Sequence, residues 1–293
     1  MSSVADRPLV SIVTPFLNPG RFLEESLASV LAQTYTRWEH LLVDDGSSDG
    51  SGEIAARWAE RHPGRVWLLA DAGRGSQGSS AARNLGIRQA RGEYLALLDA
   101  DDVWLPTHLA DQTALLERHP EAALAYGPTE EWYSWTGRPE DGVRDQVPSI
   151  RIAPGIAMPA PGPLAAFVRR SAPTPCTCSV VARRSVVEAV GGFEEAFPGM
   201  YDDQAFYAKL CLAASVVASD TCTSRYRRHA GSLYSKAQST RSPGPNRLRF
   251  LEWLDGYVTR HGVRDRAVRS ALGRELWAAR HPFIGRLLGR AGI

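Results

Sequence analysis

Short apolar runs alternate with stretches of helical spacing through the first hundred residues. The apolar runs cover residues 9–14, 38–43, 66–70 and 94–98. The stretches with apolar residues at helical spacing lie between them, at about 22–33, 52–61 and 80–90. Short runs rich in Val, Ile and Leu predict strands, and strands that alternate with helices form parallel sheets. The pattern therefore predicts an α/β fold with an open, Rossmann-like sheet.

The second half of the chain predicts fewer and shorter elements. We expect helices at about 106–119, 186–190 and 202–213, and strands at 122–126, 176–181 and 216–218. The short helix should end at Gly191-Gly192, since glycine commonly ends helices. Residues 138–163 are rich in Pro and Gly and have no clear period, which predicts a long loop.

The end of the chain has its own pattern. The segment Ser242–Asn246 reads Ser-Pro-Gly-Pro-Asn and predicts a linker between a first unit, 1–240, and an extension, 241–293. Apolar residues at helical spacing then predict two helices, at about 248–257 and 268–276. A short amphipathic, basic segment begins at Phe283 and Ile284. Segments of this kind more often pack against the body of their own protein than lie on a membrane.

Charge is distributed unevenly along the 293 residues. The extension 241–293 holds 11 Arg and 4 acidic residues, a net charge of +7, which leaves −5 for residues 1–240 out of +2 overall. A basic extension leaves open peripheral contact with an anionic membrane surface. No apolar run reaches about 18 residues and the start of the chain lacks an apolar signal core, so we expect a cytoplasmic protein, peripheral at most at the inner face of the membrane.

The four cysteines give no recognised metal motif. They stand at Cys176, Cys178, Cys211 and Cys222, without a Cys-x-x-Cys pair and without a suitably spaced His. We expect reduced, mostly buried thiols and no zinc site. The period of a strand would place Cys176 and Cys178 on one face.

Three carboxylates follow the fourth apolar run. Asp99, Asp101 and Asp102 lie within four positions, and like charges this close repel one another unless a cation, water or a shared proton relieves them. Hard oxygen ligands at this spacing suit Mg²⁺ or Mn²⁺. The sequence thus indicates a metal site, with an acidic turn that caps the next helix as the alternative.

Several polar positions should meet at one edge of the sheet. Thr14, Asp45, the glycine-rich loop after Ala70 and Asp99 all come at the carboxyl ends of predicted parallel strands. Ligands of open α/β sheets bind at this edge. We therefore expect these positions to line one crevice.

The glycine-rich loop has a second interpretation. Residues 73–78 read Gly-Arg-Gly-Ser-Gln-Gly, a G-x-G-x-x-G between a strand and a helix, with Asp99 about twenty residues later. This is the arrangement of a dinucleotide-binding fingerprint, so NAD binding stays an alternative. A mobile segment over phosphates is the other interpretation.

Seven short motifs follow one another in an order that resembles a known family. They are Val10-Ser-Ile-Val-Thr14-Pro, Val43-Asp-Asp-Gly-Ser47-Ser-Asp-Gly, Ala82-Arg-Asn-Leu-Gly86, Leu98-Asp-Ala-Asp-Asp102, Gly191-Gly-Phe-Glu-Glu195, Asp202-Asp203 and Arg228-His229-x-x-Ser232. Together they resemble the family 2 glycosyltransferases of GT-A fold. The resemblance reaches about residue 232 and implies a mixed, mostly parallel central sheet flanked by helices. Within 1–240 it implies a nucleotide-binding half, 1–105, and an acceptor and catalytic half, 106–240.

The resemblance also implies a donor site and a metal site. The positions matched to nucleotide-sugar binding are Thr14, Pro15, Asp45, Arg83, Asp99, Ala100 and Asp101. The positions matched to a divalent ion, Mn²⁺ or Mg²⁺, are Asp101, Asp102 and His229. A surface residue in a basic strand is an equal alternative for His229, and Arg227 and Arg228 are expected to pair with phosphate oxygens.

Asp203 is the implied catalytic base. In the family the second member of an acidic pair removes the proton from the acceptor hydroxyl, and a single displacement then inverts the anomeric centre. A neighbouring Asp202 would raise the pKa of Asp203 and help it act as a base. The alternative is that both carboxylates cap the helix. The pair here is Asp-Asp, where Glu-Asp is more usual.

The implied function is a metal-dependent, inverting glycosyltransferase that adds one sugar. The donor is a nucleoside diphosphate sugar, with UDP first, and the acceptor is the hydroxyl of a saccharide, a lipid-linked precursor or a natural product. No nucleic acid partner is expected, and the absence of Gln-x-x-Arg-Trp speaks against a processive synthase. We expect residues 138–163, the aromatic residues 132–135 and the C-terminal helices to shape the acceptor site. The alternatives are a dinucleotide-binding or non-catalytic sugar-nucleotide-binding protein, and a nucleotidyltransferase.

Overall fold

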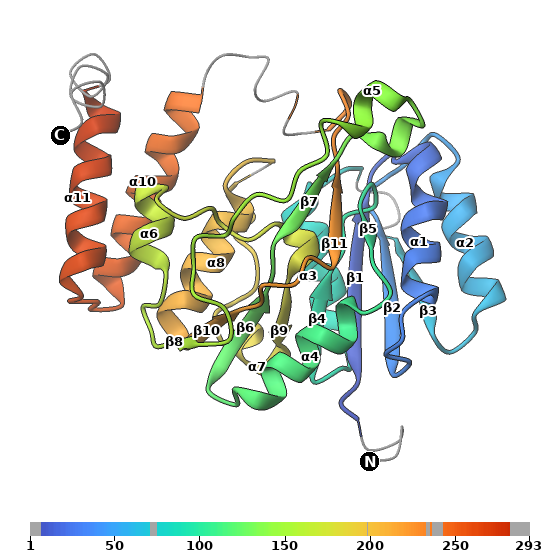
Figure 1. Cartoon of the computed structure of the whole chain (residues 1–293), viewed down its shortest axis with the longest axis horizontal. Coiled ribbons are helices and arrows are strands. Elements are labelled where there is room, and N and C mark those ends of the chain that lie inside the picture. The colour runs from blue at the N-terminus through green and yellow to red at the C-terminus, as the bar shows by residue number, and fades with distance from the viewer. Residues whose placement is uncertain (1–6, 71–74, 198, 233–234, 236–242, 282–293) are drawn as a thin grey trace.

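A mixed central sheet organises the molecule (Figure 1). The structure is a computed structural model, and it describes residues 7–70, 75–197, 199–232, 235 and 243–281. Within these residues the sheet has eight strands, in the order β3 (Val66–Ala70), β2 (Trp38–Asp44), β1 (Val10–Phe16), β4 (Tyr94–Leu97), β9 (Val181–Arg183), β6 (Ala122–Tyr126), β10 (Ser215–Ala218) and β8 (Ala157–Met158).

The first four strands are parallel, as the apolar runs predict. Val10 of β1 pairs with Trp38 of β2 on one side and with Tyr94 of β4 on the other. β9 is antiparallel to both β4 and β6 and joins the first half of the sheet to the second. The crossover helices are α1 (Leu23–Leu31), α2 (Ser51–Arg61) and α3 (Ser79–Gln89). The carboxyl ends of β1, β2 and β4 therefore share one edge of the sheet.

The strands are apolar on both faces because helices cover both. Alternate residues of one strand enter different hydrophobic clusters, so that Val13 belongs to one cluster and Ile12 to the other. Every residue of β1 is buried. The continuous apolar runs of the sequence follow from this two-sided burial.

A smaller sheet lies beside the carboxyl edge. It consists of β5 (Val103–Trp104), β11 (Ser224–Arg227) and β7 (Thr129–Trp132), in that order. β5 begins directly after Asp102, and its partner β11 leads directly into Arg228 and His229. This pairing brings the acidic cluster and the basic stretch together, although about 120 positions of sequence separate them.

The remaining helices pack mainly around the second half of the sheet. They are α4 (His108–Arg118), α5 (Pro139–Gly142), α6 (Leu164–Arg169), α7 (Arg184–Ala189), α8 (Asp202–Ala213), α10 (Pro243–Arg260) and α11 (Arg266–Arg280), with 3-10 turns η2 (Gly20–Phe22), η3 (Ser134–Thr136) and η4 (Thr177–Ser179). Figure 1 shows α10 and α11 beside α6, at the end of the molecule opposite α1 and α2.

The C-terminal helices share the core of the body. Leu251 and Leu254 of α10 and Leu272 of α11 are buried in the same hydrophobic cluster as Val13 of β1. No described helix combines the length and the apolar character needed to cross a membrane. The amphipathic basic end that begins near Phe283 lies outside the described residues, and the division of the chain at residue 240 stays a prediction.

Three predicted elements differ from the structure. The strand expected over 176–181 is instead the 3-10 turn η4 followed by β9, because the hydroxyl of Ser179 donates to the carbonyl of Cys176 and closes a turn. The linker expected at Ser242–Asn246 is wrong from Pro243 onward, where α10 begins, since the first turn of a helix tolerates proline. The loop over 138–163 contains the short elements α5 and β8.

Gly86 lies where α3 packs tightly against Val13 of β1. A Cβ atom at this position would lie 2.5 Å from Cγ1 of Val13, so Gly86→Ala should destabilise the fold by about 1–3 kcal/mol through overpacking. Urea unfolding followed by circular dichroism measures the change. Gly273→Ala is the control: no atom lies within 4 Å of its Cβ position in α11, and alanine should stabilise this helix by about 0.5–1 kcal/mol. Equal midpoints for the two variants would contradict the packing argument.

Candidate functional site

Arg83 joins two distant acidic groups at the sheet edge. Its guanidinium lies 2.6 Å from Oδ1 of Asp99 and 2.8 Å from Oδ2 of Asp202. The hydroxyl of Ser79 also donates to Asp202. Burial lowers the pKa of Arg83, but the charges of Asp99 and Asp202 outweigh burial and raise it above its ordinary value. The side chain thus connects the end of β4 to the start of α8.

Asp101 and His229 are in contact at the carboxyl edge of the sheet, where both side chains are partly exposed. Oδ2 of Asp101 lies 2.9 Å from Nε2 of His229, and 29% and 12% of the two side chains are exposed. The ring of Phe22 packs against the imidazole, with ring centroids 4.7 Å apart. The carboxylate oxygens of Asp101 suit Mn²⁺ or Mg²⁺, and the imidazole of His229 is a common ligand of transition metals. The predicted metal ligands Asp101 and His229 are therefore neighbours.

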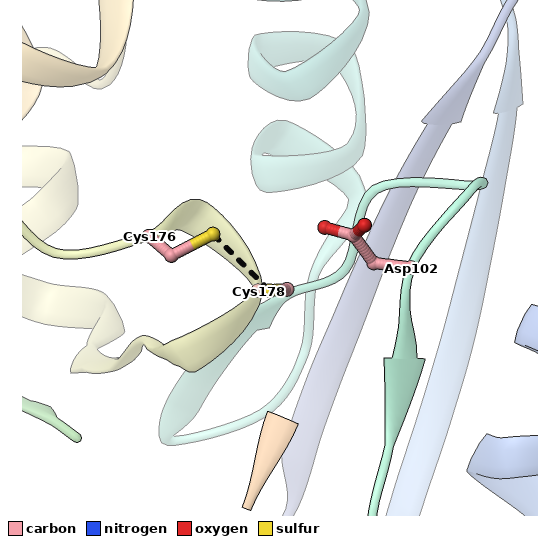
Figure 2. A group of neighbouring side chains, drawn as sticks. All are labelled: Asp102, Cys176 and Cys178. Carbon is pink, nitrogen blue, oxygen red and sulfur yellow. Dashed lines mark hydrogen bonds between the residues drawn. The ribbon is translucent and has the colours of Figure 1, made fainter. Parts of the chain in front are cut away.

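Asp102 lies apart from that pair, in the interior. It is fully buried, and its Oδ1 accepts the backbone N–H of Arg227 at 2.9 Å. Burial, with the nearby charge of Asp101, raises the pKa of Asp102 well above its usual range. The structure turns this carboxyl toward Cys176 and Cys178 (Figure 2) and does not bring it to His229.

Arg227 holds the acidic loop from inside. Only 2% of its side chain is exposed, its Nε donates to the carbonyl of Asp101 at 2.7 Å, and its Nη2 pairs with Glu25 at 2.7 Å. The ring of Trp132 covers the guanidinium. The expected phosphate contact of Arg227 is therefore wrong, since its charge is already paired and covered. Arg228 donates to the hydroxyl of Tyr133.

The predicted donor residues of β1 face the interior. Thr14 Oγ1 lies 2.8 Å from His40 Nε2, and both side chains are buried. Burial lowers the pKa of His40 to about 3, so the imidazole is neutral. Pro15 is buried in the same strand, and Ala100 is buried in the turn after β4. The side chains at these positions are therefore buried beneath the carboxyl edge of the sheet and do not project into solvent.

Asp45 is engaged with the glycine-rich loop. Its carboxylate accepts hydrogen bonds from the hydroxyl of Ser76 at 2.6 Å and from the backbone N–H groups of Gln77 at 2.7 Å and Gly78 at 3.0 Å. A dinucleotide fingerprint would direct such N–H groups toward a pyrophosphate. In this chain they point at a protein carboxylate. Residues 71–74 of the loop lie outside the described part.

Asp203 opens α8 next to Asp202. Its Oδ1 accepts the N–H of Gln204 at 2.7 Å, and the preceding Tyr201 has a left-handed backbone, with φ of 67°. Burial, and then the charge of Asp202, raises the pKa of Asp203 to about 7. A carboxyl with such a pKa exchanges its proton near neutral pH, which suits a general base.

A cavity adjoins the start of α8. It measures about 450 Å³, and Tyr201 and Gln204 line it from either side of the acidic pair. Arg151, Arg170 and Arg247 contribute to its walls. These arginines stand in loops or helices with no motif, so no sequence pattern predicts a functional role for them. The one sequence feature that pointed toward them was the basic, Pro-rich composition around the predicted loop over 138–163.

The comparisons with known proteins agree on one family. The model of the family described as Glycosyl transferase family 2 matches residues 11–190, more than half of the chain. The glycosyltransferase GlyG of Streptococcus pneumoniae serotype 4 is 42% identical over 95 residues, which cover 32% of this chain and 31% of GlyG. The chain thus matches about a third of the length of this curated relative.

Two solved structures share the fold. S. aureus TarS 1-349 in complex with UDP-GlcNAc superposes with a TM-score of 0.69 at 19% identity, over 94% of this chain and 73% of that one. The mannosyltransferase PcManGT from Pyrobaculum calidifontis, in complex with GDP-Man and Mn²⁺, has a TM-score of 0.59 at 20% identity, over 99% of this chain and 81% of that one. The predicted GT-A fold is confirmed.

Replacing Arg83 by Met should uncouple the two acidic groups. Arg83→Met keeps the apolar stem but leaves the carboxylates of Asp99 and Asp202 without their cation, and breaking buried pairs of this kind costs about 3–5 kcal/mol. Chemical denaturation measures the loss. Arg88→Met, on the exposed side of the same helix, should change the stability by less than about 0.5 kcal/mol. Similar unfolding midpoints for both variants would count against the bridge.

Proposed function

The chain belongs to glycosyl transferase family 2, and from that premise we propose that it is an inverting, metal-dependent glycosyltransferase that adds one sugar to a hydroxyl acceptor. One observation carries the proposal. Arg83 draws Asp99, beside the candidate metal ligand Asp101, toward Asp202, beside the candidate base Asp203. A donor bound at Asp99 and Asp101 and an acceptor at Asp203 would then lie next to each other, as group transfer requires.

The proposed donor is a nucleoside diphosphate sugar. The fold is that of proteins solved with UDP-GlcNAc and with GDP-Man, which supports this class of donor. The carboxylate of Asp45 accepts N–H groups, which uracil and thymine offer at N3 and guanine also offers, and among these bases we place uracil first. Asp99 lies at the same edge and would accept a ribose hydroxyl.

Asp101 and His229 would hold the divalent ion. Their oxygen and nitrogen are already neighbours and partly exposed. When bound, Mn²⁺ or Mg²⁺ supplies positive charge beside the departing diphosphate and lowers the energy of its release. Asp102 is left out of this set because its carboxyl is buried on the far side of the loop.

Asp203 would take the proton from the acceptor. The freed hydroxyl oxygen forms a bond to the anomeric carbon from the face opposite the diphosphate. The bond from that carbon to the diphosphate oxygen breaks, and its electron pair leaves with the nucleoside diphosphate. A single displacement of this kind inverts the anomeric centre.

The acceptor would occupy the cavity beside α8. Tyr201 and Gln204, which flank the acidic pair in the sequence, line this cavity, and arginines contribute to its wall. Arg247 pairs with Glu275 at 2.9 Å. The charge toward the cavity therefore comes from Arg151 and the well-exposed Arg170. This charge favours an acceptor that carries phosphate or carboxylate, such as a lipid-linked precursor, over a neutral saccharide.

Calorimetric titration tests the donor and metal assignments together. UDP, GDP, dTDP and NAD are titrated into the protein with and without Mn²⁺. We expect one nucleoside diphosphate, UDP first, to bind more tightly with Mn²⁺, and Asp101→Asn to lose this enhancement by about tenfold or more. Tight binding of NAD without metal would support the dinucleotide alternative. Release of pyrophosphate during turnover would support a nucleotidyltransferase.

Asp203→Asn should abolish sugar transfer while leaving donor affinity unchanged. General base catalysis is worth about 10²–10⁴ in rate, and an amide cannot accept the proton. For the unchanged protein the rate should rise with pH through about 7, because Asp203 acts as a base only when ionised. The readout is release of nucleoside diphosphate, with water as acceptor until the natural one is known. Asp220→Asn, an exposed carboxylate, serves as control, and full activity in Asp203→Asn would remove this residue from the base role.

A further inference from the structure

A second group of ligating atoms lies behind the acidic loop. Asp102, Cys176 and Cys178 each offer one ligand atom, and these atoms lie within 4.8 Å of one another (Figure 2). Asp102 comes from the loop between β4 and β5, whereas the cysteines flank the start of η4. About 75 residues of sequence separate them, so no spacing motif announces the group.

One oxygen of this group lacks a partner. Asp102 is 0% exposed, its Oδ1 accepts the N–H of Arg227, and its Oδ2 has no hydrogen-bond partner among the described residues. A buried carboxyl oxygen that receives no hydrogen bond from the protein is stabilised by a proton, a water molecule or a cation. Figure 2 shows the carboxyl group turned toward the two cysteines.

The two thiols are held in place as a pair. Their sulfur atoms lie 3.3 Å apart. The backbone around them is fixed, since Ser179 donates twice to the carbonyl of Cys176 and the indole N–H of Trp104 donates to the carbonyl of Cys178 at 2.6 Å. Two thiolates bound to one tetrahedral Zn²⁺ lie about 3.8 Å apart, a small shift from the observed separation. Cys176 is partly exposed, which gives an ion a path from solvent.

We propose that Asp102, Cys176 and Cys178 bind one Zn²⁺ ion. Thiolate ligands select zinc over the harder Mn²⁺ and Mg²⁺, which prefer oxygen donors such as the carboxylate of Asp101. On binding, the two thiols and the Asp102 carboxyl release any protons they hold to solvent, and two thiolates and a carboxylate then share the divalent charge. The ion also gives the orphan oxygen of Asp102 a partner.

A water molecule would take the fourth position of the tetrahedron, and the role of this zinc is to join two segments of the chain. It fastens η4 to the loop that carries Asp101, and Arg227 binds both the Asp102 carboxylate and the Asp101 carbonyl from the other side. The proposal does not rest on the transferase assignment, because its ligands belong to none of the groups assigned to donor or acceptor.

Co²⁺ is the probe, because thiolate–cobalt bonds absorb in the near ultraviolet. The full chain is reduced, stripped with a chelator and titrated with Co²⁺, and Zn²⁺ is then added. We expect one equivalent of Co²⁺ to give the thiolate absorption and one equivalent of Zn²⁺ to remove it. Cys176→Ser and Cys178→Ser should each weaken binding by about tenfold or more and lose most of the band.

Two controls locate the site. Cys222→Ser removes a partly buried thiol elsewhere and should keep the band, and Asp101→Asn alters the other candidate metal site and should also keep it. Cys178 is fully buried, so circular dichroism checks its variant, and the partly exposed Cys176 gives an independent test. An unchanged band in Cys176→Ser would overturn the proposal. Reduced protein that takes up neither Co²⁺ nor Zn²⁺, or thiols that remain a disulfide under reductant, would overturn it as well.

Discussion

The candidate site depends on the two ion pairs that the buried guanidinium of Arg83 forms with Asp99 and Asp202. Four carboxylates, those of Asp99, Asp101, Asp202 and Asp203, gather at one edge of the sheet and raise one another's energy. Arg83 offsets this repulsion from the centre, because it pairs with one carboxylate of each group. It stands on α3, whose close packing against β1 fixes the position of the charge. Without that cation the end of β4 and the start of α8 would repel each other.

Stability is supplied elsewhere in the molecule. The sheet carries apolar clusters on both faces, and α10 and α11 extend one of them. Asn84, next to Arg83, binds both the N–H and the carbonyl of Phe193 and so fastens the turn after α7. Well-packed surroundings of this kind hold groups that are unfavourable by themselves, such as the left-handed Tyr201 and the partly buried carboxyl of Asp203 beside Asp202.

Sequence reasoning recovered the elements that local pattern controls. The four parallel strands and the helix over 202–213 agree with the structure, because apolar runs and helical spacing are properties of neighbouring residues. The strand expected over 176–181 failed because a side-chain hydrogen bond of Ser179 competes with the ladder. Motif order located most of the candidate site. Motif order did not predict which ion pairs the charged side chains form. The two-residue strand β5 and the ion pair of Arg227 with Glu25 depend on residues far apart in the sequence, so no local pattern predicts them.

A ligand that binds the carboxylate of Asp45 must first replace hydrogen bonds that this group already accepts. The carboxylate accepts three hydrogen bonds from the loop that ends at Gly78. Hydrogen bonds to a charged group contribute about 1.5–3 kcal/mol each, so a base that replaces them gains only the difference. Binding is then an exchange of partners, and its apparent affinity is lower than its contacts suggest. In the proposed reaction the same exchange would run backward after transfer, because the loop would compete for Asp45 with the nucleoside diphosphate that remains and so favour its release.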